Sequence, residues 1–238
     1  MGNYAETLLL GDFLDQKVAE HPDRTVFQSR GRITSYQELS DAVDKCAKVM
    51  LASGLCKGDC IAVLSAPRSE VFITFFAAAR IGLLWLGVNP KYQIREMRHC
   101  MAGAKPRMLF GIKSLDGRDY LEEVNILRDE FSHIENFVGF DSEEPYNISF
   151  DDWLNGQQCP EEDYAQAKAG VENTIDTMLI YTSGSSGTPK GVLLPQKAIL
   201  KRALVEWDVF PIDPYPRVMC PLPITHVGGI IVLPLYAM

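Results

Sequence analysis

The stretch from residue 177 to residue 194, TMLIYTSGSSGTPKGVLL, places a Gly/Ser-rich centre between two apolar runs. The runs TMLIY (177–181) and GVLL (191–194) have the length and composition of buried strands. A flexible linker of similar composition would separate domains, whereas this centre joins two predicted strands that lie close together in the sequence. We therefore expect a loop between two strands of one sheet.

The side chains of this loop suit a polyphosphate. Gly184 and Gly187 can adopt positive φ, which lets successive backbone N–H groups point into one concavity. Lys190 adds a positive charge directly after Pro189. Short hydroxyl donors are supplied by Thr182, Ser183, Ser185, Ser186 and Thr188. The loop is predicted to bind phosphate.

Two well-known phosphate loops do not match this spacing. A Walker A loop requires GxxxxGK[ST], but Pro189 stands five residues after Gly184, and Gly191 follows Lys190. A dinucleotide fingerprint requires GxGxxG at the start of a helix, and here GxxG precedes a predicted strand. The loop is therefore predicted to be a phosphate-binding loop of a different type from these two.

Helix and strand signals alternate through most of the chain from residue 32 onward. Ser35 and Glu38 form an S-x-x-E capping box, and Gly54 is placed to end the helix that begins there. Apolar runs predict strands at 60–64, 84–88, 107–110 and 136–140, with helices at 69–81, 94–101 and 119–131 between or after them. This order predicts an α/β fold with largely parallel sheets flanked by helices.

Three further segments complete the predicted fold. Residues 141–174 are polar, acidic and weakly periodic, so we expect a surface excursion. A helix is expected at 196–207 and a strand at 217–220. A last helix is expected to begin at Gly228.

Composition excludes several classes of protein. The net charge of −8 over 238 residues disfavours a nucleic-acid binder, which needs a basic surface. The six cysteines contain no CxxC pair and the four histidines form no cluster, which disfavours a zinc site. Residues 71–88 are apolar, but Arg80 and Gly82 interrupt them, so a buried helix and strand are expected rather than a membrane span. The first residues lack a secretion signal, and a cytoplasmic location is expected.

Several motifs resemble those of the adenylate-forming (AMP-binding) enzymes, which include acyl-CoA synthetases, luciferases and the adenylation domains of peptide synthetases. The eleven residues YTSGSSGTPKG (181–191) are similar to the signature loop of that superfamily. TSYQEL (34–39), RIGLLWLGVNP (80–90) and PLPITH (221–226) resemble other segments of the family in order and spacing. The resemblance covers the chain from about residue 8 to its end.

The resemblance implies activation of a carboxylic acid by ATP and Mg²⁺, followed by transfer of the acyl group to CoA. It places the β- and γ-phosphates on Thr182, Ser183, Gly184, Ser185, Ser186, Gly187, Thr188 and Lys190, with the Thr182 hydroxyl facing the metal. Lys190 and His226 are the expected catalytic residues, and His226 with Gly228 would line the pocket for the acyl carboxylate. His21, His99 and His133 are expected in polar or helical surface positions without a role.

The same motifs favour one branch of the family. Amino-acid-activating members usually carry an aspartate in an FDxS-like segment, and Ile224-Thr225-His226 has no carboxylate there. A carboxylic acid–CoA ligase is therefore expected, with an amino-acid adenylation domain of peptide-synthetase type and a non-catalytic binding or assembly fragment as alternatives.

Members of this family are about twice as long as 238 residues. Residues 1–238 are therefore expected to be an incomplete N-terminal AMP-binding domain, without the "YGxTE" motif, the ribose-binding aspartate and the mobile C-terminal domain. Such a piece alone is expected to be inactive. Its apolar end, Leu233–Met238, could support self-association.

Overall fold

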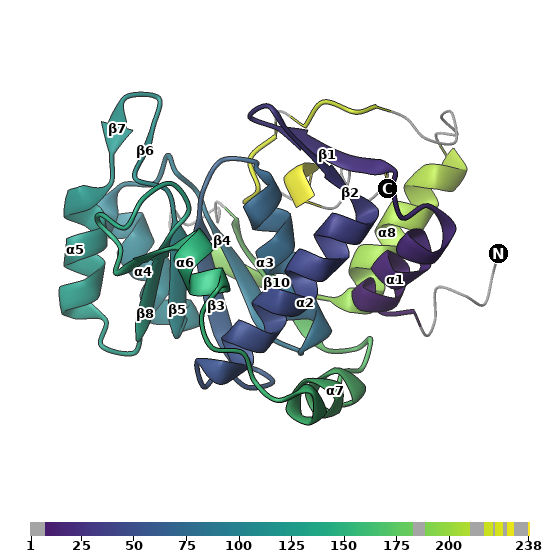
Figure 1. The fold of residues 1–238 in the computed structure, drawn as a ribbon. Coiled ribbons are helices and arrows are strands. Elements are labelled where there is room, and N and C mark those ends of the chain that lie inside the picture. The colour runs from purple at the N-terminus through teal and green to yellow at the C-terminus, as the bar shows by residue number, and fades with distance from the viewer. Residues whose placement is uncertain (1–7, 183–188, 210–216, 221, 226–227, 231–237) are drawn as a thin grey trace.

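The computed structural model describes residues 8–182, 189–209, 217–220, 222–225, 228–230 and 238. A seven-stranded sheet forms its centre, and helices lie on both sides (Figure 1). All neighbouring strands are parallel except the last pair at one edge, where β11 runs antiparallel to β10. In spatial order the strands are β11 (Lys190–Pro195), β10 (Asp176–Thr182), β4 (Leu84–Val88), β3 (Cys60–Leu64), β5 (Met108–Gly111), β8 (Asn136–Gly139) and β9 (Ile148–Ser149). The predicted α/β class is confirmed.

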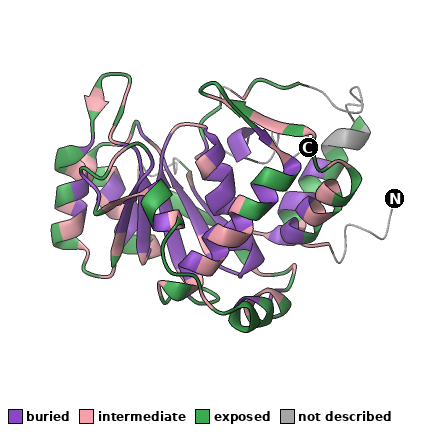
Figure 2. Cartoon of the chain, in the orientation of Figure 1, coloured by how far each residue is buried: buried purple, intermediate pink, exposed green. Residues whose placement is uncertain are grey.

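The central strands are apolar because both faces of the sheet are covered. Every residue of β3 and β5 is buried, and β4 is buried beyond its first residue (Figure 2). Continuous apolar runs of this kind are what a parallel sheet between two helical layers requires. The four strands predicted at 60–64, 84–88, 107–110 and 136–140 are all present, with shifts of one residue at some ends.

The order of the strands places the helices on opposite faces. The chain passes from β3 through α3 (Ser69–Arg80) to β4 on one side, then from β4 through α4 (Ile94–Ala104) to β5 on the other side of β3. Right-handed crossovers that move in opposite directions put their helices on opposite faces. The helix α5 (Leu121–Glu130) packs beside α4, while α1 (Leu10–Glu20) and α2 (Tyr36–Ala52) pack on α3.

The capping box that begins α2 has the expected reciprocal bonds. The Glu38 N–H donates to the Ser35 hydroxyl at 3.2 Å, and the Ser35 N–H donates to the Glu38 carboxylate at 2.7 Å. Gly54 follows the helix with φ of +83°, a conformation that favours glycine. The sequence signal for both ends of α2 is confirmed.

The apolar stretch 71–88 is a buried helix and strand, as expected. Arg80 lies at the end of α3 with a side chain only 1% exposed, and it forms ion pairs with Asp15 and Asp44. In the described part of the chain, no helix is both long enough and apolar enough to cross a bilayer.

Most residues of 141–174 are exposed, as expected for a surface excursion, but the regular elements and buried aromatic residues of this segment were not predicted. This segment contains β9, α6 (Phe150–Leu154) and α7 (Glu161–Ala169), and it buries four aromatic side chains, Tyr146, Phe150, Trp153 and Tyr164. Trp153 packs edge-to-face on Phe110 of β5, with ring centroids 5.1 Å apart. The segment covers the sheet with a few large anchors rather than with a continuous amphipathic face, which explains its weak periodicity.

The remaining expectations concern the smaller elements and the last part of the chain. The hairpin of β1 (Thr25–Ser29) and β2 (Arg32–Ser35) was not predicted, and neither was α1; a second small hairpin is formed by β6 (Ser114–Leu115) and β7 (Arg118–Asp119). The strand expected at 217–220 is absent, since those residues are irregular and Met219 is 83% exposed. The helix expected at 196–207 is α8 (Gln196–Val209), which contacts β10 and β11.

Candidate active site

The two ends of the predicted phosphate loop emerge at the carboxyl edge of the parallel strands. β10 runs parallel to β4, so its last residue, Thr182, lies at the edge where β4, β3 and β5 also end. In open α/β sheets this edge is where ligands bind. The loop therefore leaves the sheet at the side that the fold makes available for a site.

The strands β10 and β11 hold the two ends of the loop in register. Thr182 is paired with Lys190, and Tyr181 is paired with Gly191. Directly paired residues of antiparallel strands project to the same face, so Thr182 and Lys190 share one face of the hairpin. The Thr182 hydroxyl lies 3.5 Å from the Lys190 carbonyl oxygen, and both residues are exposed. Ser183, Gly184, Ser185, Ser186, Gly187 and Thr188 lie outside the described residues.

Lys190 is an exposed residue at the start of β11. Within the described residues, no carboxylate forms an ion pair with it. An exposed threonine and an exposed lysine at the two ends of a loop rich in glycine are a suitable arrangement for phosphate oxygens.

The opposite face of the hairpin packs on α4. The Tyr181 ring stands edge-to-face against the His99 ring, with centroids 5.6 Å apart. The hydroxyl of Tyr181 reaches Gly103, where an added Cβ would overlap it. Burial raises the pKa of the Tyr181 phenol. Tyr181 therefore fills the space between the hairpin and α4 as a neutral, largely packed side chain.

His99 differs from its expected surface role. It is half-buried, and its Nε2 lies 2.8 Å from the carbonyl oxygen of Pro189, the residue before Lys190. Because a carbonyl oxygen can only accept, Nε2 carries the proton and donates it. Nothing local in the sequence marks this contact, since the two residues are 90 positions apart and belong to different elements.

The segment that precedes His226 also reaches this part of the sheet. Ile224 is fully buried, and its carbonyl oxygen would lie 3.2 Å from a Cβ placed on Gly87 of β4. β4 is the direct neighbour of β10, so this segment packs on the strand beside the one that leads into the phosphate loop. His226 itself lies outside the described residues.

The glycines that follow His226 let the chain fold back on itself. Gly228 and Gly229 are buried, and a Cβ on Gly229 would overlap the carbonyl oxygen of Pro223. The Cys220 thiol lies 3.5 Å from the Gly229 carbonyl oxygen. The described residues on both sides of His226 are thus held close together, which only a residue without a side chain at 229 permits. Residues 228–230 form a short helical turn, and the rest of the helix expected from Gly228 falls on residues 231–237, outside the described residues.

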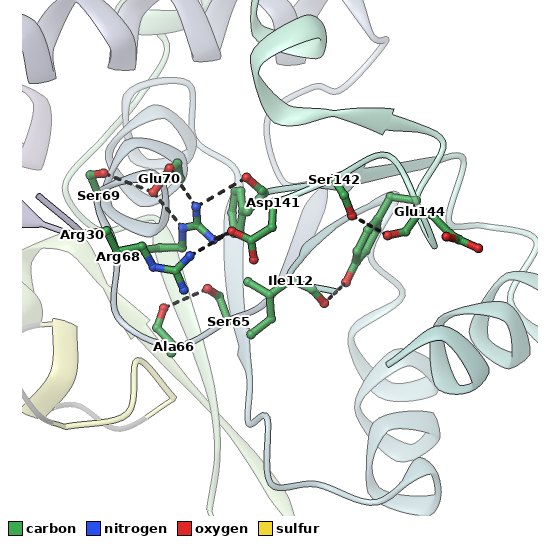
Figure 3. Close-up of polar contacts among 12 residues, drawn as sticks. Arg30, Ser65, Ala66, Arg68, Ser69, Glu70, Ile112, Asp141, Ser142 and Glu144 are labelled. Carbon is green, nitrogen blue, oxygen red and sulfur yellow. Dashed lines mark hydrogen bonds and ion pairs between the residues drawn. The ribbon is translucent and has the colours of Figure 1, made fainter. Parts of the chain in front are cut away.

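A separate polar cluster lies between β3, α3 and the chain after β8 (Figure 3). Arg68 donates two hydrogen bonds to Glu70, at 2.8 and 3.0 Å, and one to Asp141 at 2.6 Å. Arg30, from the turn between β1 and β2, donates to the same Asp141 oxygen at 3.0 Å. Burial opposes the charge of Glu70, but the hydrogen bonds and charge of Arg68 hold its pKa below the ordinary 4.5. Both carboxylates are thus bonded to arginines. Because Arg30 lies in the β1–β2 turn and Asp141 follows β8, the cluster joins this hairpin to the sheet.

The described residues show no group of metal ligands formed by the protein alone. A Mg²⁺ ion could bind here through oxygen atoms of a phosphate ligand together with a few protein donors. Mg²⁺ is commonly held in this way, through one or two protein groups and the phosphates of a substrate. The Thr182 hydroxyl is a suitable donor by type and by position.

Comparison with known proteins decides the family. A family model described as AMP-binding enzyme matches residues 14–238. The chain belongs to this AMP-binding family. Two curated relatives are the indoleacetate–CoA ligase of Aromatoleum aromaticum, 29% identical over 93% of this chain, and the acyl-CoA ligase sidI of Aspergillus fumigatus, 26% identical over 94%.

This member of the AMP-binding family spans less than half the length of these relatives. It spans 41% of the first and 40% of the second. Among solved structures, a Mycobacterium tuberculosis fatty acyl CoA synthetase has the same fold, with a TM-score of 0.78 and 20% identity. That match covers 96% of this chain and 42% of the other.

Proposed function

We propose that this chain supplies the ATP-phosphate site of an AMP-forming carboxylic acid–CoA ligase, as part of the N-terminal domain of such an enzyme. The observation that carries the proposal is the position of the signature loop. Its ends are held in register at the carboxyl edge of the sheet, with the exposed Thr182 and Lys190 on one face. Both curated relatives named above are CoA ligases by name, which supports the same branch.

The proposed reaction has two steps. A carboxylate oxygen of the acid attacks the α-phosphorus of ATP, and the bond from that phosphorus to the β-phosphate oxygen breaks, giving an acyl-adenylate and pyrophosphate. The thiolate of CoA then attacks the acyl carbon and displaces AMP, giving the thioester.

The first step moves negative charge onto the leaving pyrophosphate. Lys190 is proposed to neutralise that charge, and the backbone and hydroxyl groups of the loop hold the β- and γ-phosphates in place. The loop groups are those of Thr182, Ser183, Gly184, Ser185, Ser186, Gly187 and Thr188. Bound Mg²⁺ would screen the same oxygens, with Thr182 as a protein donor.

His226 and Gly228 are proposed to line the pocket of the acyl carboxylate. The support is the close packing of Ile224 against β4 and of Gly229 against Pro223, which brings the segment to the strand beside the loop. All six cysteines are free thiols, which fits a reducing compartment such as the cytosol.

The test uses the complete gene product that contains this chain. Pyrophosphate release is followed with ATP, Mg²⁺, CoA and a panel of aliphatic, aromatic and amino acids. Lys190→Ala should lower kcat/KM for ATP by about 10²–10³-fold, the usual effect of removing one preorganised electrostatic group. Lys201→Ala, which removes an exposed lysine from α8, is the matched control and should leave the rate unchanged.

Three results would overturn the proposal or redirect it. Absence of pyrophosphate release with every acid would refute it, and so would an unchanged rate for Lys190→Ala. Release that depends only on amino acids would assign the chain to the peptide-synthetase type instead.

A further inference from the structure

His99 contacts both ends of the predicted phosphate loop. Its ring packs on Tyr181, the residue before Thr182, and its Nε2 donates to the carbonyl oxygen of Pro189, the residue before Lys190. One side chain of α4 therefore touches the loop where it leaves the sheet and where it returns. No other element contributes a hydrogen bond to the Pro189 carbonyl among the described residues.

The hydrogen bond from His99 to Pro189 restrains a whole peptide unit rather than one oxygen atom. The carbonyl of Pro189 and the N–H of Lys190 belong to the same planar peptide unit, so fixing the oxygen also fixes the direction of that N–H and the position of the Lys190 Cα. Proline adds to this constraint because its ring holds φ near −65°. The backbone from which the Lys190 side chain starts is thus held on one side by its pairing with Thr182 and on the other by the bond from His99 to Pro189.

The helix that carries His99 is a firm support. α4 begins with a capping box in which the Gln93 N–H donates to the Glu96 carboxylate at 2.7 Å. Its buried face carries Met97, Cys100 and Met101, and Arg98 is bonded to Glu130 of α5. A side chain on a helix packed in this way can hold a loop in a fixed place.

We propose that His99 is a positioning residue for the phosphate loop, acting on ATP through the Pro189–Lys190 peptide. This inference rests on the function proposed above, and it assigns to His99 no contact with substrate. Its chemical requirement is a single N–H donor at the position of Nε2.

That requirement can be tested with two amide side chains that place the donor differently. The amide nitrogen of Gln lies as many bonds from Cβ as Nε2 of His, whereas that of Asn corresponds to Nδ1 and is too short to reach Pro189. His99→Gln should therefore keep the bond and His99→Asn should lose it, although both remove the ring. His99→Ala removes ring and donor together.

The first measurement is the dependence of pyrophosphate release on MgATP in the complete gene product. His99→Asn and His99→Ala should lower kcat/KM for MgATP by about 5- to 10-fold, the fold-change of one lost hydrogen bond, mainly through KM. His99→Gln should stay within about twofold of the unsubstituted protein. Equal losses in the Gln and Asn variants, or no loss in either, would overturn the proposal while leaving the ligase assignment intact.

The second measurement does not depend on activity. Hydrogen exchange of peptides covering residues 181–191 should be faster in His99→Asn than in His99→Gln, since only the former frees the Pro189–Lys190 peptide. If pyrophosphate release fails for all acids but this difference in exchange is seen, the ligase assignment falls and the role of His99 in holding the loop stands. Equal exchange in the two variants would overturn the role of His99 whatever the activity.

Discussion

Replacing Gly103 by alanine tests the contact between α4 and the hairpin that carries the phosphate loop. Gly103 lies one residue before the end of α4, and a Cβ there would overlap the hydroxyl of Tyr181. The next nearest atom, Cζ of the same ring, would be 3.6 Å away, an ordinary van der Waals distance. The steric conflict is therefore confined to one oxygen atom, which Tyr181→Phe removes.

Two effects of opposite sign determine the result. Alanine is favoured over glycine in a helix by roughly 0.5–1 kcal/mol. Overpacking of a well-filled site costs about 1–3 kcal/mol. Gly103→Ala alone should therefore destabilise the protein by about 0–2.5 kcal/mol. In the Tyr181→Phe background, where only the helix effect remains, the same substitution should stabilise it by about 0.5–1 kcal/mol.

The assay is urea unfolding of the four proteins of this double-mutant cycle, with thermal midpoints as a second measure. The coupling free energy between the two positions should be about 1–3 kcal/mol, since the conflict exists only when both the added methyl group and the hydroxyl are present. A change of 1 kcal/mol corresponds to about 2–4 °C in a protein of this size. If Gly103→Ala stabilises both backgrounds equally, the hydroxyl does not lie against α4, and the reasoning on the hairpin is refuted.

Three further predictions concern stability and thiol chemistry. Ser35→Ala should lower the unfolding free energy by about 1 kcal/mol because the Glu38 N–H loses its acceptor, and a thermal midpoint unchanged within error would contradict the capping box. The ionised Glu70 should contribute its full share to the free energy of unfolding above pH 4.5, where the carboxyl group is also ionised in the unfolded chain, and this share should be lost as the pH falls through its lower folded-state pKa. The difference in urea midpoint between the unsubstituted protein and Glu70→Gln should therefore shrink on acidification. A constant difference would refute the pairing with Arg68. A thiol reagent should label the exposed Cys56 in the native protein, whereas the buried Cys46, Cys60 and Cys100 should react only on unfolding. Burial raises the pKa of Cys60 and Cys100 to about 12 and that of Cys46 still further, so these thiols stay protonated in the folded protein. Mass spectrometry of labelled peptides checks this, and labelling of the buried thiols before unfolding would contradict it.

Much of the fold follows from short-range patterns in the sequence. The apolar run at 60–64 indicates a strand covered on both faces, which the structure shows, and the signals at Ser35 and Gly54 mark the ends of α2 to within a residue or two. These features depend on neighbours in the chain, on backbone hydrogen bonding and on the conformational freedom of glycine. The chemical character of the phosphate loop is local in the same sense.

The buried aromatic residues of segment 141–174 could not be predicted from such short-range patterns. Its aromatic anchors, such as Trp153, are buried because Phe110 of β5 is there to receive them. A polar stretch with widely spaced aromatic residues has the same pattern whether or not such a partner exists. Only the arrangement of the sheet distinguishes the two cases.

In the candidate site, too, some features follow from adjacent residues and others only from packing between distant elements. The sequence by itself determined that a Gly/Ser loop with Lys190 lies between two strands, since strand length, glycine and charge are properties of adjacent residues. Only the tertiary structure decided that β10 lies beside β4, that the loop leaves the sheet at its carboxyl edge, and that His99 meets Pro189. The physical reason is that these contacts arise from packing between elements far apart in the chain, and no local preference of either partner encodes them.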